Sequence, residues 1–148
     1  MNQAIPIPRA ILASEGVPVL LRADAPLGLR LRDMALTFEV TRDEEYVHLF
    51  MTENGRTLDF GDRSHHYLLL TLARRRLADA AQHHPDWSCG WTYADELTRD
   101  PTLMNVHIYR LRKQLEHAGL LDPAQIIERR RSTRQVRIGS SNLEVVVR

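Results

Sequence analysis

The stretch that most constrains how this chain can fold is residues 103–117, which read LMNVHIYRLRKQLEH. The stretch contains no glycine or proline, so nothing in it interrupts a helix. Its apolar residues recur at spacings of four, three and four, which places them on one side of a helix. They are Met104, Ile108, Leu111 and Leu115. The opposite side, at 100° per residue, carries Val106, Tyr109, Arg110, Lys113 and His117. The pattern predicts a helix with one face on a core and a basic outer face. The preceding Asp-Pro-Thr at residues 100–102 predicts a turn followed by an N-cap.

Residues 126–138 read IIERRRSTRQVRI and predict two short strands joined at Ser132 and Thr133. Arginines are crowded at the tip of this hairpin, on both sides of the turn. A helix with a basic outer face followed by an arginine-tipped hairpin is typical of a winged helix-turn-helix, in which the hairpin is the wing.

The segment NVHIYRLRKQLE resembles the recognition helix of OmpR/PhoB-type effector domains, in which runs such as VHIxRLRKKL recur. The agreement covers Val106, His107, Ile108, Arg110, Leu111, Arg112, Lys113 and Leu115. The upstream segments YLLLTLARRRLAD and WTYADELTRD resemble the first helix and the scaffold helix of that domain, and the closing hairpin resembles its wing. A closer resemblance is to the winged-helix segment of bacterial proteins that also carry a forkhead-associated domain. It rests on similar YLLLTLARxRLAD, GW and ERR segments and spans about residues 34–147. The resemblance implies a DNA-binding domain of a bacterial transcription regulator that acts in signal transduction.

The first sixty residues predict an antiparallel β-meander. Residues 1–17, with two prolines, are expected to form an arm or an edge strand, and residues 19–22 a strand. Residues 27–32 alternate leucine with polar residues, which indicates a strand with one buried face. Further strands are predicted at 36–41, 46–51 and 57–60, with a turn at 43–45 and the hairpin signal Asn54-Gly55. The last strand, 143–147, is expected to pair in the wing sheet.

The predicted fold class is therefore α+β: an N-terminal antiparallel sheet at residues 1–60, then a three-helix winged helix-turn-helix at 61–148, both parts of one domain. The first helix should start at Asp62 or Ser64 as its cap and end near Gln82. A short helix is expected at residues 93–99 with Thr92 as its cap. The resemblance places Trp91 in a small strand at the wing. The run Arg74–Arg76 is either a solvated face of the first helix or a phosphate contact.

The candidate DNA-binding residues lie on the outer face of the helix and at the wing tip. They are Asn105, Val106, His107, Tyr109, Arg110, Lys113, Arg131 and Arg134. Arg110 suits a bidentate contact to guanine, Lys113 a phosphate, and Val106 either a thymine methyl group or the turn before the helix. Asn105 suits an adenine edge or a phosphate, and His107 is expected to be structural or a phosphate contact. Arg131 and Arg134 suit the backbone or the minor groove.

Charge is distributed unevenly along the chain. Residues 1–102 hold eleven Arg and fifteen Asp or Glu, for −4, whereas residues 103–148 hold nine Lys or Arg and four Asp or Glu, for +5; together they give the net +1. The basic third coincides with the predicted helix and wing, which favours double-stranded DNA as the partner.

Other classes of function find little support in the sequence. No nucleophile triad, phosphate-binding loop or paired carboxylates nominate a catalytic site, and the histidine spacings match no metal pattern, so we expect no enzyme, metal or cofactor. No run is long and apolar enough for a membrane span, and the lone Cys89 fits a reducing compartment, so we expect a cytoplasmic protein.

The alternative is a winged-helix module that binds a protein in a signalling chain. Sixty residues are too few for a receiver or a forkhead-associated domain, and the predicted first sheet is acidic, so a signalling domain or partner protein could dock there. A homodimer on DNA is a further expectation. The target sequence and the input signal do not follow from the residues.

Overall fold

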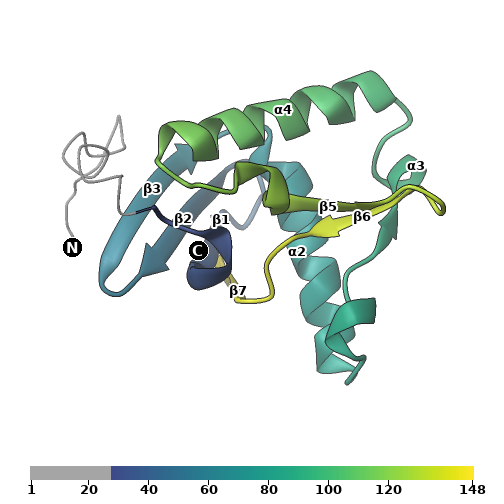
Figure 1. Ribbon diagram of the computed structural model, residues 1–148, viewed down its shortest axis with the longest axis horizontal. Helices are drawn as coiled ribbons and strands as arrows, with labels where there is room; N and C mark the ends of the chain where they lie inside the picture. Colours follow the sequence, from purple (N-terminus) through teal and green to yellow (C-terminus); the bar gives the residue numbers. More distant parts are fainter. Residues whose placement is uncertain (1–27) are drawn as a thin grey trace.

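The computed structural model describes residues 28–148, so the arm expected at 1–17 and the strand expected at 19–22 lie outside the described residues. The described part is an α+β fold, as predicted, with two β-sheets and the helices α2 (His66–Ala81), α3 (Ala94–Leu97) and α4 (Pro101–His117). In Figure 1, α4 spans the top of the view. The hairpin of β5 (Ile127–Arg130) and β6 (Gln135–Ile138) lies below it with its turn close to α3. None of the described helices is long and apolar enough to cross a membrane.

The first sheet contains the predicted antiparallel meander. Its strands are β1 (Ala35–Val40), β2 (Val47–Glu53) and β3 (Arg56–Asp62), and alternate residues of each are buried. Asn54 and Gly55 form the β2–β3 turn with positive φ angles of 50° and 80°, the conformation for which this residue pair is favoured.

The fourth strand of this sheet comes from the other end of the chain. β7 (Leu143–Val147) runs parallel to β1, with Leu36 opposite Leu143, and the strand order is β3-β2-β1-β7. The expectation that residues 143–147 pair in the wing sheet was wrong. The side chains of Leu143 and Val145 pack against the core beneath the first sheet. Pairing with β1 therefore buries this apolar face of β7, which pairing with the short hairpin of β5 and β6 would not.

The predicted strand at residues 27–32 was also wrong for the part that the structure describes. Leu29 makes a single bridge to Leu120, and Leu31–Asp33 form a 3-10 helix, η2. The backbone N–H of Leu31 donates to the carboxylate of Asp122 at 2.9 Å, which fixes this turn. The alternation correctly indicated burial, because Leu29 and Leu31 are both in the core, but it did not determine the backbone conformation.

Helix α2 (His66–Ala81) packs against both sheets through its buried leucines. Neither Asp62 nor Ser64 caps it: the N-cap position is His65, with no side-chain hydrogen bond to the first turn. Downstream come the 3-10 helix η3 (Asp86–Ser88), the two-residue strand β4 (Thr92–Tyr93) and helix α3 (Ala94–Leu97). Thr92 is thus a strand residue and not the expected cap, and α3 is shorter than the predicted 93–99.

Helix α4 (Pro101–His117) is followed by the 3-10 helix η4 (Pro123–Ile126) and the hairpin of β5 (Ile127–Arg130) and β6 (Gln135–Ile138). β4 pairs with β6, giving a second sheet of order β4-β6-β5. One core, shared by the first sheet, α2, α4 and the hairpin, holds these parts together.

Candidate nucleic-acid interface

Helix α4 begins at a well-formed N-terminus. The carboxylate of Asp100 accepts hydrogen bonds from the backbone N–H of Thr102 at 3.0 Å and of Leu103 at 3.3 Å. Pro101 occupies the first helical position, where its missing N–H leaves no bond unmade. The cap thus sets the residue at which the helix starts.

The predicted division of α4 into two faces is confirmed. Met104, Ile108, Leu111 and Leu115 are buried, whereas Asn105, Tyr109, Arg110 and Lys113 are exposed. Val106 and His107 are half-buried, and Nδ1 of His107 is buried without a hydrogen-bond partner. The six candidate residues on the helix form a continuous strip, with Val106, Tyr109, Arg110 and Lys113 at its centre and Asn105 and His107 at its edges.

The cations on this strip differ in how they are engaged. Lys113 forms an ion pair with Glu116 at 3.2 Å and lies 5.7 Å from the ring centroid of Tyr109. The hydrogen bond and charge of Glu116 raise the pKa of Lys113, so it stays protonated. The side chain of Arg110 has no hydrogen bond or ion pair within residues 28–148. Arg110 is consequently free to pair with a ligand.

The position of α4 is fixed by a polar cluster around Gln114. The amide nitrogen of Gln114 donates to the carbonyl oxygen of Phe60 at 2.7 Å, while its oxygen lies 2.8 Å from Nε2 of His65 and 3.0 Å from Nε2 of His66. Nδ1 of His66 lies 3.1 Å from the carbonyl oxygen of Val47. Gln114 therefore connects α4 to β3 and to the start of α2, and His66 extends the cluster to β2.

This cluster has no fully satisfied neutral arrangement. His66 has a hydrogen-bond acceptor next to each ring nitrogen, but a neutral imidazole carries one proton. Reversing the amide of Gln114 would supply a donor to His66. It would also turn the side-chain oxygen of Gln114 toward the carbonyl oxygen of Phe60, so that two acceptors would face each other. Burial nevertheless lowers the pKa of His66 to about 4, since a charged ring would lose its hydration there.

The hairpin of β5 and β6, which is the predicted wing and keeps that label below, presents arginines at its tip, as predicted. The turn of residues 131–134 joins β5 to β6, and the side chains of Arg131 and Arg134 are exposed, with no hydrogen bond or ion pair in the described part of the chain. Arg134 adopts a φ of 59°, the left-handed conformation that closes the turn. Arg129, in β5, donates to the side-chain oxygen of Asn105 at 3.4 Å, which links the wing to the outer strip of α4.

Other arginines hold the wing in place. The guanidinium groups of Arg130 and Arg137 lie 4.0 and 4.6 Å from the ring centroid of Trp91, and Arg137 also pairs with Glu128. Arg76 is buried: it donates to the carbonyl of Ile138 at 2.8 Å and pairs with Asp86 at 3.0 Å. Arg76 is therefore neither part of a solvated face nor a phosphate contact, the two roles expected for the Arg74–Arg76 run. It connects α2 to the base of the wing.

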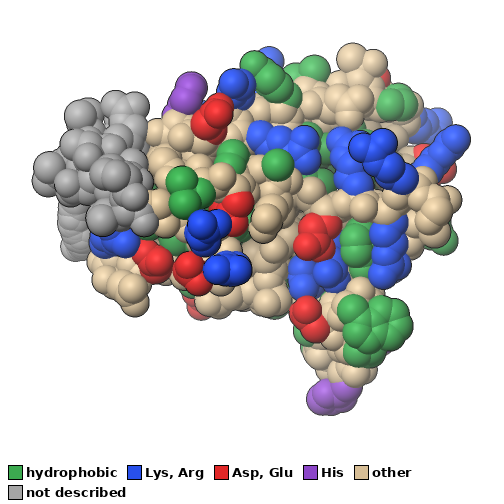
Figure 2. All heavy atoms as spheres, in the orientation of Figure 1, with side chains coloured by type: hydrophobic (Ala, Val, Ile, Leu, Met, Phe, Trp, Pro, Cys, Tyr) green, Lys and Arg blue, Asp and Glu red, His purple; other side chains and the backbone are tan. Residues whose placement is uncertain are grey.

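Arg110, Arg131 and Arg134 come from two neighbouring elements, α4 and the hairpin of β5 and β6. Figure 2 shows Lys and Arg side chains gathered over α4 and the hairpin below it, with acidic side chains more frequent elsewhere on this face. The structure thus brings the predicted helix and wing residues together on one basic surface, formed by the outer strip of α4 and the wing tip.

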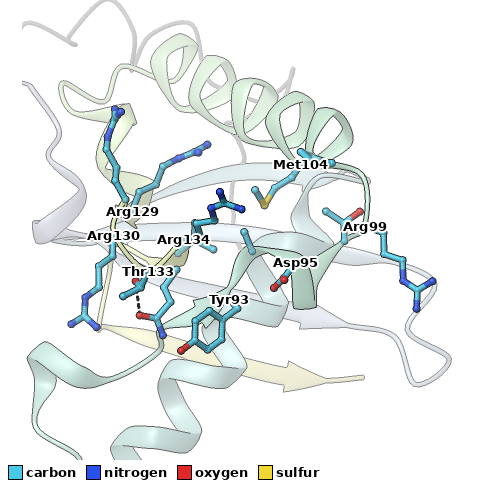
Figure 3. A pocket seen from close by; sticks show the side chains of 14 residues that line it. Tyr93, Asp95, Arg99, Met104, Arg129, Arg130, Thr133 and Arg134 are labelled. Atoms are coloured by element: carbon cyan, nitrogen blue, oxygen red, sulfur yellow. Dashed lines mark hydrogen bonds between the residues drawn. The ribbon is translucent and has the colours of Figure 1, made fainter.

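Sequence reasoning missed a second set of residues beside this surface. Tyr93, Asp95 and Arg99, from β4, α3 and the loop before α4, line a cleft that the wing arginines close (Figure 3). No local pattern marks these residues, because the cleft forms only where β4 pairs with β6. Gln114 was missed for a similar reason, since its partners are about 50 residues away in sequence.

Within residues 28–148, no three His, Cys, Asp or Glu side chains gather as the ligands of a metal ion would. Comparisons with protein-family models, with curated proteins and with solved structures find no match to this chain.

Proposed function

We propose that the chain is a winged helix-turn-helix that binds double-stranded DNA, as the DNA-binding domain of a bacterial transcription regulator. The observation that carries the proposal is the set of unpaired guanidinium groups on one surface: Arg110 on α4 and Arg131 and Arg134 on the wing. Arg74 on α2, by contrast, is paired with Glu44 at 3.0 Å. Unpaired cations on one face favour a polyanion as the partner.

Helix and wing have different roles in this proposal. α4 enters the major groove, which admits one helix, with Arg110 on a guanine edge and Lys113 on a phosphate. Asn105, Tyr109 and His107 contact bases or backbone next to it, and Val106 faces the turn before the helix or a thymine methyl group. Arg131 and Arg134 lie on the backbone or in the minor groove. Specificity then comes from the helix and a large part of the affinity from the wing.

The experiment compares two single substitutions on a selected duplex and on random duplex DNA. Arg110→Ala removes a base contact, so it should weaken binding to the selected duplex by ~1–3 kcal/mol and to random DNA much less. Arg131→Ala removes a side-chain charge that contacts the DNA backbone. It should therefore weaken binding to the selected and the random duplex by similar factors, and make the slope of log K against log salt shallower by about one. Arg42→Ala, in an exposed turn of the first sheet, is the matched control and should change neither.

Two results would contradict the proposal. Absence of a complex with any duplex at ~50 mM salt would exclude DNA as the partner. Binding that does not respond to salt would exclude phosphate contacts as its basis. Either result would favour the second candidate, a protein-interaction module, for which the observation is the exposed acidic turn of Asp43, Glu44 and Glu45.

A further inference from the structure

A cleft of about 500 Å³ opens between β4, α3, the start of α4 and the wing turn (Figure 3). Its volume falls within the range of small-molecule sites in proteins, which is about 300–1,000 Å³. Its floor is apolar, because Met104 and Val136 line it and are themselves almost fully buried. An apolar floor with a few polar groups around it is the usual construction of a ligand site.

The rim of the cleft is strongly basic. Five arginines line it against one carboxylate, Asp95; they are Arg99, Arg129, Arg130, Arg131 and Arg134. Arg129 and Arg130 already have partners, in Asn105 and in Trp91, but the other three have none within residues 28–148. In Figure 3, Arg134 reaches from the wing turn toward Met104, over the cleft. The planar guanidinium group matches the geometry of both phosphate and carboxylate groups, and a phosphate carries the higher negative charge that a rim of several arginines favours.

Two further groups indicate more than a phosphate. The ring of Tyr93 lines the cleft with 48% of its surface exposed, so it offers a flat face for stacking. The carboxylate of Asp95 is exposed and makes no hydrogen bond or ion pair in the described part of the chain. A carboxylate accepts hydrogen bonds and repels a phosphate, so its natural partner is a hydroxyl or amino group of a ligand.

We propose that this cleft binds a small ligand of the nucleotide class: a phosphate group held by Arg134 and Arg131, a flat ring next to Tyr93 and Met104, and a hydroxyl or amino group on Asp95. Binding of the ligand does not depend on the DNA proposal. Its consequence for DNA does rest on the proposed function: the ligand occupies the arginines assigned to the DNA backbone, so ligand and duplex compete.

The test begins with the full chain and no DNA. Adenosine and guanosine 5′-monophosphate are titrated by calorimetry, with inorganic phosphate and the unphosphorylated nucleosides as comparison ligands. At least one mononucleotide should bind tenfold more tightly than phosphate and than its own nucleoside. If both mononucleotides bind no better than phosphate, the cleft has no site for a ring and the proposal is overturned.

Variants then locate the site. Arg134→Asn removes the cation, and asparagine tolerates the φ of 59° at this position better than alanine does. It should weaken mononucleotide binding at least tenfold, whereas the distant Arg42→Ala should leave it unchanged. Thermal melting of Arg134→Asn verifies that the variant is folded. Mononucleotide binding that survives in a folded Arg134→Asn variant would place the site elsewhere and overturn the proposal.

Adding duplex DNA separates this proposal from the previous one. A saturating mononucleotide should weaken the apparent affinity for duplex at least tenfold in wild type and not in Arg134→Asn. If mononucleotide binds and duplex does not, the cleft proposal stands and the DNA proposal fails. If both bind without affecting each other, the shared role of Arg131 and Arg134 is refuted.

Discussion

His66 makes the stability of this fold depend on pH in a direction that the structure determines. Its side chain is fully buried, and burial lowers its pKa from the ordinary 6.5 to about 4. Below pH 6.5 the unfolded chain binds a proton at this position and the folded chain does not, so the unfolded state gains stability as the pH falls. The contribution of His66 is therefore present above pH 6.5 and is lost progressively between 6.5 and about 4.

The size of the effect follows from the same two values. The gap between 6.5 and about 4 corresponds to about 3 kcal/mol in total, and about 2–3 kcal/mol of this falls between pH 7.5 and 4.5. His65, whose pKa burial also lowers, acts in the same direction. For His48, burial lowers the pKa, but the hydrogen bond and charge of Asp59 outweigh it and the pKa is raised. Its contribution is present below pH 6.5 and is lost as the pH rises, so it opposes the other two.

A variant comparison isolates His66 from these neighbours. Urea unfolding at pH 7.5 and 4.5 gives the loss of stability on acidification for wild type, for His66→Gln and for His117→Gln, an exposed control on α4. The loss should be about 2–3 kcal/mol smaller in His66→Gln than in the other two proteins. If instead wild type loses less stability on acidification than His66→Gln does, the acceptors at Val47 and Gln114 outweigh burial, and the reasoning is refuted.

Two other substitutions test how the basic surface is positioned. Asp100→Ala removes the cap of α4 and should cost about 0.5–2 kcal/mol by urea unfolding, whereas Asp100→Asn should keep most of the stability; unchanged stability of Asp100→Ala would show that the carboxylate does not act as a cap. Gly139→Ala would place a Cβ atom 1.7 Å from the backbone oxygen of Gln125, so it should cost about 1–3 kcal/mol or more, measured by thermal melting against the exposed control Ser141→Ala. Unchanged melting of Gly139→Ala would contradict the close approach of η4 and β6.

Local sequence patterns predicted the elements that depend on neighbouring residues. The helix predicted at 103–117 occurs at Pro101–His117, and the hairpin predicted within 126–138 occurs with its turn at residues 131–134. The spacing of apolar residues determines which face of α4 is buried, so the outer strip with Arg110 was predictable. These features need only interactions within a few residues.

Features that depend on distant contacts were not predictable in this way. Arg76 lies in a run that reads as a charged surface, but the carbonyl of Ile138, 62 residues later, makes it a buried connector. The alternation at residues 27–32 correctly gave the burial of Leu29 and Leu31, while the backbone there responds to Leu120 and Asp122. The cleft beside the basic surface belongs to this class as well, since two separate segments of the chain, residues 93–104 and 129–136, form it.

The parallel pairing of β7 with β1 affects how the chain can reach its folded state. Leu36 pairs with Leu143, so the sheet formed by the first described strands is completed only when the last ones have been synthesised. Contacts between residues so far apart in sequence close late, because a long loop must first be ordered. During translation, the edge of β1 would stay open and prone to pairing with other chains until β7 arrives. A fragment that ends after the wing, before residue 143, should therefore aggregate even though it contains the complete basic surface.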